Sequence, residues 1–205
     1  MPSKREGYLL ILGILVLIII VSVLAFSIPY DDPLTLIVRL FALYGFLFLS
    51  IATIMTPFLK EITKLFGKPF IKIHHIFAVF GLASATIHPV TYSIQAQNIL
   101  VFIPSFASWY DFWSLAGRPA LPIIYVALIA VLLRNQIQNY WRPVHALMYI
   151  VLFFGIVHGN LIGTDFQNIV ILIIFNSLFG AAIVTFILKR LQQYQLKKRR
   201  SRKNI

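Results

Sequence analysis

The chain contains no cysteine among its 205 residues, and only six of its side chains are aspartate or glutamate. The absence of cysteine excludes disulfides, cysteine-ligated zinc or iron–sulfur clusters, and haem attached through thioether bonds. Charged residues of both signs make up 12% of the chain and apolar residues 60%, whereas soluble domains are roughly 45–50% apolar. The composition therefore excludes an ordinary water-soluble domain.

Long apolar runs account for nearly all of this apolar content. A helix needs roughly 20 apolar residues to cross a bilayer. Six such runs cover residues 8–28, 34–58, 71–94, 120–133, 144–162 and 169–188, and the fourth is the shortest. No linker or repeat separates them, so we expect one domain over residues 1–205, without room for a flavin- or nucleotide-binding domain of ordinary size. The sequence predicts an all-α integral membrane bundle of six transmembrane helices.

The positions of the basic residues predict the orientation of this bundle in the membrane. Sixteen of the 18 lysines and arginines lie before the first run, in the second and fourth connections, and in a basic tail at residues 189–205. Positive residues remain on the cytoplasmic side, so we expect both termini to be cytoplasmic in a multi-pass protein of the cell membrane. The tail should lie against anionic lipid headgroups, with an acidic partner as the alternative. The net charge of +12 does not indicate nucleic-acid binding, because its placement follows the membrane.

All five histidines lie in two of the six runs. His74, His75 and His88 are in the third run, and His145 and His158 are in the fifth. Ionisable side chains inside a bilayer are costly and usually mark a function. Both of these helices should run outward, which predicts two levels of histidines. His74 (or His75) pairs with His145 near the cytoplasm, and His88 pairs with His158 about 20 Å further out.

The spacing of the histidines tests this pairing. His74 and His88 are 14 residues apart, which places them within about 40° of each other on an ideal helix. His145 and His158 are 13 residues apart, which corresponds to about 140°. The fifth helix must therefore be overwound or irregular, with Gly155 as the candidate position.

Opposed imidazoles from two helices are suited to bind haem iron axially. Two haems b stacked between the helices would carry electrons across the bilayer. A divalent-metal transporter is the rival interpretation, but zinc and similar ions also favour carboxylate ligands, and the predicted spans contain none. A single-haem membrane anchor of a redox complex is a further alternative, as are neutral histidines bonded within the core.

The segments that carry the histidines resemble those of a known family. The segment Trp141-Arg-Pro-Val-His145, followed by His158-Gly159, resembles the fifth helix of ferric reductase-like transmembrane domains, and His74-His75 with His88 resembles their third. The family includes NADPH oxidases, metalloreductases and the haem-binding subunit of the periplasmic methionine sulfoxide reductase system. The resemblance covers roughly residues 31–162 and implies a membrane cytochrome b.

Two features bear on the branch of that family. Thr56-Pro57 and Arg118-Pro119 are most similar to the methionine sulfoxide reductase subunit. That branch has arginines at the place of His74-His75, so the histidines here favour two bis-histidine haems, as in the oxidases.

The resemblance also bears on the electron donor. Larger family members carry a C-terminal flavin and nicotinamide domain, whereas this sequence ends at residue 205, shortly after the last predicted span. We expect a separate cytoplasmic reductase or a quinol as donor, with flavin or quinone supplied by that partner. An outer-side reductase is a candidate acceptor.

Four basic residues near the two levels are candidates to bind haem propionates, because cationic side chains pair with carboxylates. Arg39 lies inside the outer end of the second run, where snorkelling to the headgroups is the alternative. Arg118 is the other outer candidate, and Lys72 and Arg142 are the inner ones. The aromatic residues of the connection 95–117 predict an interfacial belt, or a lid over the outer haem.

Overall fold

The computed structural model describes residues 4–66 and 70–203. Its secondary structure is 86% helix, and no strand is present in the part of the chain that it describes. This confirms the all-α prediction. Of the basic residues in the topology argument, Lys68 lies outside the described residues.

Ten helices and three short 3-10 turns follow one another along the described chain. The helices are α1 (Lys4–Ser27), α2 (Pro33–Ile54), α3 (Leu59–Phe66), α4 (Phe70–Gln95), α5 (Trp109–Ser114), α6 (Gly117–Leu132), α7 (Arg134–Ile137), α8 (Trp141–His145), α9 (Met148–Ile162) and α10 (Ile169–Lys203). The 3-10 turns are η1 (Thr56–Phe58), η2 (Ile99–Phe102) and η3 (Thr164–Gln167).

Five segments are long and apolar enough to cross a membrane, which makes this a multi-pass membrane protein by length and composition. They are Glu6–Ser27, Pro33–Phe58, Ile71–Gln95, Trp141–Ile162 and Ile169–Gln195. The fourth predicted span corresponds to α6, which is apolar but has only 16 residues. Such a helix is about 24 Å long, shorter than the roughly 30 Å hydrocarbon core.

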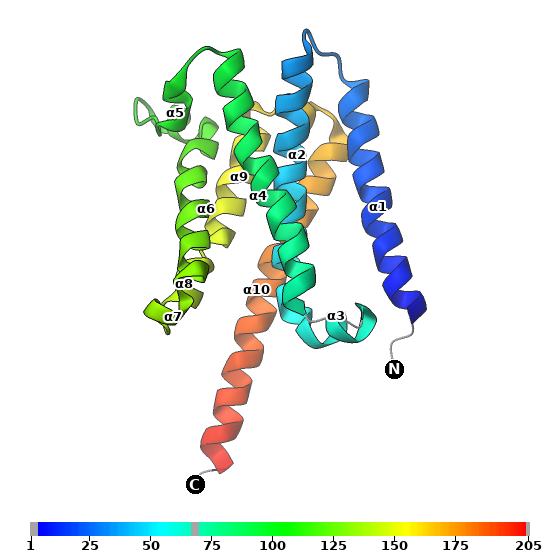
Figure 1. Cartoon of the computed structure of the whole chain (residues 1–205), viewed down its shortest axis with the longest axis vertical. Helices are drawn as coiled ribbons and strands as arrows, with labels where there is room; N and C mark the ends of the chain where they lie inside the picture. Colours follow the sequence, from blue (N-terminus) through cyan, green and yellow to red (C-terminus); the bar gives the residue numbers. More distant parts are fainter. Residues whose placement is uncertain (1–3, 67–69, 204–205) are drawn as a thin grey trace.

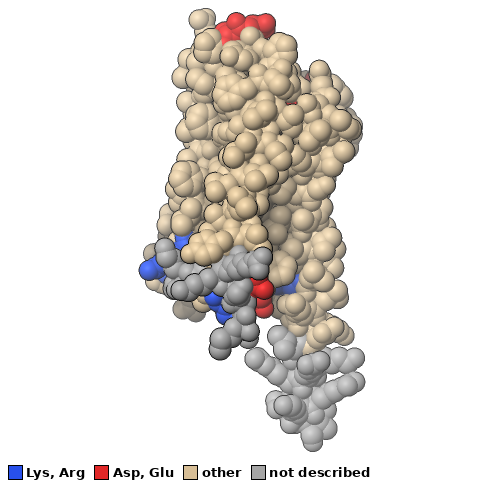
Figure 2. All heavy atoms as spheres, turned by 90° about the vertical axis from the view of Figure 1, so that its right-hand side faces the viewer, with Lys and Arg blue, Asp and Glu red and all other residues tan. Residues whose placement is uncertain are grey.

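The helices stand side by side, with α3 lying across one end (Figure 1). The start of α1 and the end of α10 are at that same end, and α10 extends past the rest of the bundle. Figure 2 shows a broad tan surface between acidic side chains at the opposite end and charged side chains near α3. A wide surface without charge is what lipid tails require.

Helix α2 is the central element, and it packs most extensively against α4. The helix begins cleanly, because Pro33 occupies its first turn and Asp32 caps it by accepting a hydrogen bond from the Thr35 amide at 3.1 Å. The Thr35 hydroxyl also donates to Asp32, and this bond is the main reason that the pKa of this carboxyl lies below its usual value.

Two glycines allow the close approach of α2 and α4. A Cβ atom on Gly45 would lie 2.9 Å from the backbone nitrogen of Ala85, and one on Gly81 would lie 2.8 Å from that of Leu49. Both distances are too short for any side chain, and backbone atoms cannot swing away. These glycines therefore set how near the two helices lie, as small residues do in membrane bundles.

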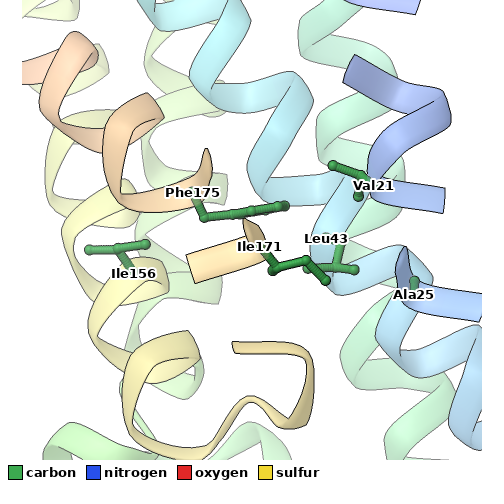
Figure 3. Close-up of a cluster of buried hydrophobic side chains, with 6 residues drawn as sticks. All are labelled: Val21, Ala25, Leu43, Ile156, Ile171 and Phe175. Carbon is green, nitrogen blue, oxygen red and sulfur yellow. The ribbon is translucent and has the colours of Figure 1, made fainter. Parts of the chain in front are cut away.

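The other half of the bundle packs around α9. Helix α9 contacts α6, α5 and α10. A cluster of buried apolar side chains joins α1, α2, α9 and α10, as Figure 3 shows. It consists of Val21, Ala25, Leu43, Ile156, Ile171 and Phe175.

Candidate functional site

The structure brings four histidines together as two pairs. The rings of His74 and His145 have their centres 6.3 Å apart, with their planes at 77°. The rings of His88 and His158 have their centres 6.4 Å apart, with their planes at 62°. We call these the inner pair and the outer pair, after the predicted topology. In each pair α4 supplies one imidazole, and α8 or α9 supplies the other.

The two histidines of α4 are held by carbonyl groups of α2. The Nδ1 atom of His74 lies 3.1 Å from the Ala52 oxygen, and that of His88 lies 2.9 Å from the Val38 oxygen. A carbonyl can only accept a hydrogen bond, so Nδ1 must carry the hydrogen. In a neutral imidazole the lone pair is then on Nε2, the form that binds metals.

These two hydrogen bonds are separated by the same number of residues along α4 and along α2. The interval from His74 to His88 along α4 equals the interval from Val38 to Ala52, their acceptors, along α2. Gly81 lies midway between the two histidines, and Gly45 lies midway between the two acceptors. The glycine contact at the centre therefore brings both histidines within reach of α2.

The α8–α9 segment holds its two histidines in the same way, but through carbonyl groups of α6 and α5. His145 Nδ1 lies 3.2 Å from the Ala127 oxygen on α6, and His158 Nδ1 lies 2.6 Å from the Ser114 oxygen at the end of α5. The interval between these two histidines again equals the interval between their acceptors. All four imidazoles thus have Nδ1 bonded to a backbone carbonyl, which fixes both the tautomer and the ring orientation.

The ring separations match those of a shared metal ion. With a metal–nitrogen bond of about 2 Å and Nε2 about 1 Å from the ring centre, two imidazoles on opposite sides of one ion have ring centres about 6 Å apart. Both observed separations agree with this value. No group of three or more histidine, cysteine, aspartate or glutamate side chains suited to a metal occurs among the described residues. Two imidazoles per level are the number of axial protein ligands that a haem takes, since its porphyrin supplies four further nitrogens.

The helix carrying His145 and His158 is irregular, as the spacing requires, but at a different place from the one predicted. Helix α8 ends at His145, and the Leu147 and Ile150 amides bond three residues back, at 3.0 and 2.9 Å. This 3-10 geometry turns about 120° per residue instead of about 100°, which rotates His158 toward the side of His145. Gly155, the candidate position, lies inside regular α9, where its missing side chain makes room for a ring of α2.

One residue beside the outer pair was missed by the sequence analysis. A Cβ atom on Gly117, the first residue of α6, would lie 3.2 Å from Cδ2 and 3.3 Å from Nε2 of His158. The missing side chain leaves room beside the nitrogen that would bind iron. No spacing rule pointed to Gly117, because the contact joins two segments far apart in the chain.

His75 is not part of the inner pair. It is exposed, and its ring centre lies 6.1 Å from that of its neighbour His74. Among the described residues, its Nδ1 forms no hydrogen bond to a carbonyl comparable to those of the four paired histidines. The structure therefore brings His74, rather than His75, to His145.

Arg39 has a different partner from those that the sequence predicts. Its guanidinium is buried and forms an ion pair with Asp165 in η3, with Nη2 2.7 Å from Oδ1. Nε also donates to both carboxylate oxygens of Asp165, at 3.2 and 3.1 Å. Nη1 and Nη2 donate to the carbonyls of Ile28, Pro29 and Ala25 at the end of α1. The groups that the Arg39 guanidinium contacts in the structure are therefore Asp165 and these backbone carbonyls.

The other three predicted cations lie near the two levels. Arg118 follows Gly117 at the outer pair and donates to the carbonyl of Ile103 at 3.1 Å. Arg142 is three residues before His145 and lies over the Trp141 ring, 5.3 Å from its centre. Lys72 is exposed, two residues before His74.

A third cation near the inner pair was missed by the sequence analysis. Lys189 on α10 is close enough for its charge to act on both His74 and His145, and it also interacts with Arg142. The sequence assigned Lys189 to the tail at 189–205, but α10 continues unbroken to Lys203. Extending the last predicted helix beyond residue 188 would have brought Lys189 to this level.

Comparisons with protein families, with curated proteins and with solved structures found no match for this chain. The likeness to ferric reductase-like domains rests on the residues quoted above. The functional argument therefore depends on the geometry of the site.

Proposed function

We propose that this protein is an integral membrane cytochrome b that carries electrons across the bilayer through two haems b. The observation that carries the proposal is the repeated pair. At two levels along α4, an imidazole of α4 lies beside an imidazole of the α8–α9 segment, with the ring centres as far apart as those of two ligands of one metal ion. Each of the four imidazoles has its Nδ1 bonded to a backbone carbonyl. We also propose that the chain is related to the ferric reductase-like transmembrane domains that it resembles.

The chain's own residues have three tasks in this function. The four paired histidines bind iron, the carbonyls of α2, α5 and α6 hold the imidazoles in place, and the surrounding apolar helices exclude water. Haem supplies the one-electron redox chemistry, and the protein tunes it through ligands, hydrogen bonds and burial. Arg118 at the outer level, and Arg142, Lys72 and Lys189 at the inner one, are the proposed propionate partners.

The histidine pairing supports six membrane crossings. His74 pairs with His145 and His88 with His158, so α4 and α9 run in the same direction. The chain must return across the bundle between them, and α6 makes this passage (Figure 1). We therefore propose that α6 spans the membrane with help from its flanking segments, and that both termini are on the cytoplasmic side of the cell membrane. The donor is a cytoplasmic reductase or a quinol, and the acceptor lies outside.

Haem quantification tests the proposal directly. The chain is expressed with ample haem supply, purified in detergent and assayed by pyridine haemochrome. We expect two haems b per chain and a reduced-minus-oxidised spectrum of low-spin cytochrome b. A colourless, folded preparation would contradict the proposal, and metal uptake by liposomes containing that preparation would favour transport instead.

A further inference from the structure

The buried ion pair of Arg39 and Asp165 joins α2 to η3, the 3-10 turn that follows α9. Arg39 directly follows Val38, whose carbonyl accepts the hydrogen bond from His88. Asp165 is in η3, the turn directly after α9, and α9 carries His158. Arg39 therefore lies on the helix whose carbonyl bonds His88, and Asp165 lies in the turn after the helix that carries His158.

The apolar cluster of Figure 3 reinforces this connection. Leu43 on α2, one turn after Arg39, and Ile156 on α9, two residues before His158, are both buried in that cluster. Ala25, whose carbonyl accepts a hydrogen bond from Arg39, belongs to it as well. The ion pair and the cluster together determine how α2 lies relative to α9, and so how His88 lies relative to His158.

A buried ion pair is by itself weak evidence for a stabilising role. Burying an ion pair costs desolvation free energy, and apolar side chains in its place are often neutral or stabilising. The carbonyls at the end of α1 need donors, which explains a guanidinium but not the carboxylate of Asp165. The carboxylate instead balances the charge of Arg39, in a region of low dielectric constant where unbalanced charge acts over long distances.

We propose that Arg39 and Asp165 are positioning residues that set the reduction potential of the haem bound by the outer pair. This inference rests on the proposed function. The ion pair links the segments that hold the two axial histidines, and the opposite charges of Arg39 and Asp165 balance each other. Reduction adds one negative charge, so an unbalanced cation nearby favours it and an unbalanced anion disfavours it.

Redox titration of the purified full-length protein tests this inference, with the outer haem assigned by its loss in H158A. Asp165→Asn leaves the Arg39 cation unbalanced and should raise the potential of the outer haem. Arg39→Gln leaves the Asp165 anion unbalanced and should lower it. The double variant R39Q/D165N should return toward the wild-type value. The potential of the inner haem should not change in any of them, because it lies about 20 Å away along α4.

Tyr44→Phe is the matched control. It removes the hydrogen bond of 2.6 Å between Ser22 and Tyr44, which also joins α1 to α2 but carries no charge. Both potentials should remain as in the wild type. A residue with a merely structural role would shift the outer potential in the same direction in both single variants, so opposite signs are the informative result.

The outcomes separate this inference from the proposed function. Shifts of the same sign, no shift, or an equal shift of the inner haem would overturn the inference. If the single variants lose the outer haem, Arg39→Lys and Asp165→Glu preserve the charges but displace them. The EPR signal of the outer haem should then change while the inner signal stays constant, and an unchanged outer signal would overturn the positioning role. A wild-type protein without haem would instead contradict the proposed function.

Discussion

At the scale of single residues, the candidate site depends on which nitrogen of each imidazole is bonded. All four paired histidines direct Nδ1 at a backbone carbonyl, at distances between 2.6 and 3.2 Å. Backbone acceptors are supplied by the fold rather than by particular side chains, so no sequence motif announces them. Exposed His75 forms no such bond within the described part of the chain, which distinguishes it from adjacent His74.

Replacement of the histidines one at a time should separate these roles. His158→Ala should remove the outer haem and leave one haem per chain, because only the outer level loses a ligand. His75→Ala should leave two haems, because His75 does not face His145. Pyridine haemochrome and the optical spectrum measure both results. Retention of two haems in both His158→Ala and His88→Ala would contradict the pairing.

Gly117 permits a second residue-scale test. A Cβ atom there would press on the His158 ring, so Gly117→Ala should displace that ring and weaken binding of the outer haem only. The expected destabilisation is about 1–3 kcal/mol, as for other overpacked sites. Haem content and EPR of the purified variant measure the effect. Gly13→Ala is the control, because no atom from beyond its own stretch of helix lies within 4 Å of its Cβ position. An effect of equal size there would contradict the argument.

At the scale of the elements, the pairing of α2 with α4 controls both levels together. Their closest approach is at Gly45 and Gly81, halfway between the two histidines of α4. In the described part of the chain, no glycine brings the backbones of α9 and α6 together in this way. The histidines of the α8–α9 segment are aligned instead by the 3-10 turn after His145.

The sequence predicted that some irregularity was needed in this segment, because the interval from His145 to His158 does not place both on one face of an ideal helix. It could not place the irregularity, since helix winding responds to tertiary contacts. Gly155 was the natural candidate from sequence, yet its missing side chain serves packing against α2 instead.

Increasing the distance between α2 and α4 should weaken the binding of both haems, whereas the substitution at Gly117 should weaken only that of the outer haem. Gly81→Ala places a methyl group against the backbone of α2, which cannot move out of the way as a side chain could. We expect weaker binding at both levels, since His74 and His88 both lose reach to their carbonyls. Haem content per chain and thermal unfolding of the holoprotein measure the effect. Gly180→Ala should retain both haems, because no atom from beyond its own stretch of helix lies within 4 Å of the Cβ position.

At the scale of the whole molecule, the main question about membrane topology is whether α6 crosses the bilayer. Only five segments of the described chain meet the length and composition of a membrane span, yet the parallel direction of α4 and α9 requires a return between them. The basic residues of the second and fourth connections lie on one side only if α6 crosses.

The absence of cysteine makes the topology easy to measure. Single cysteines at Ala107, before α5, and at Gln136, in α7, are both at exposed positions. If α6 crosses the membrane, a membrane-impermeant maleimide should label A107C from outside intact cells and Q136C only in inverted vesicles. Labelling of both from the same side would contradict the sixth crossing.

The amino-acid sequence by itself determined that this is an all-helical membrane protein. It also placed the candidate site on the third and fifth apolar runs, because these two runs carry all five histidines. Composition and helical periodicity are local properties, and the cost of a histidine in a bilayer does not depend on the fold. Only the tertiary structure decided that His74 rather than His75 faces His145, that Arg39 pairs with Asp165, and that Gly117 and Lys189 lie beside the two levels. These are contacts between segments far apart in the chain, and their geometry depends on how neighbouring helices pack and wind.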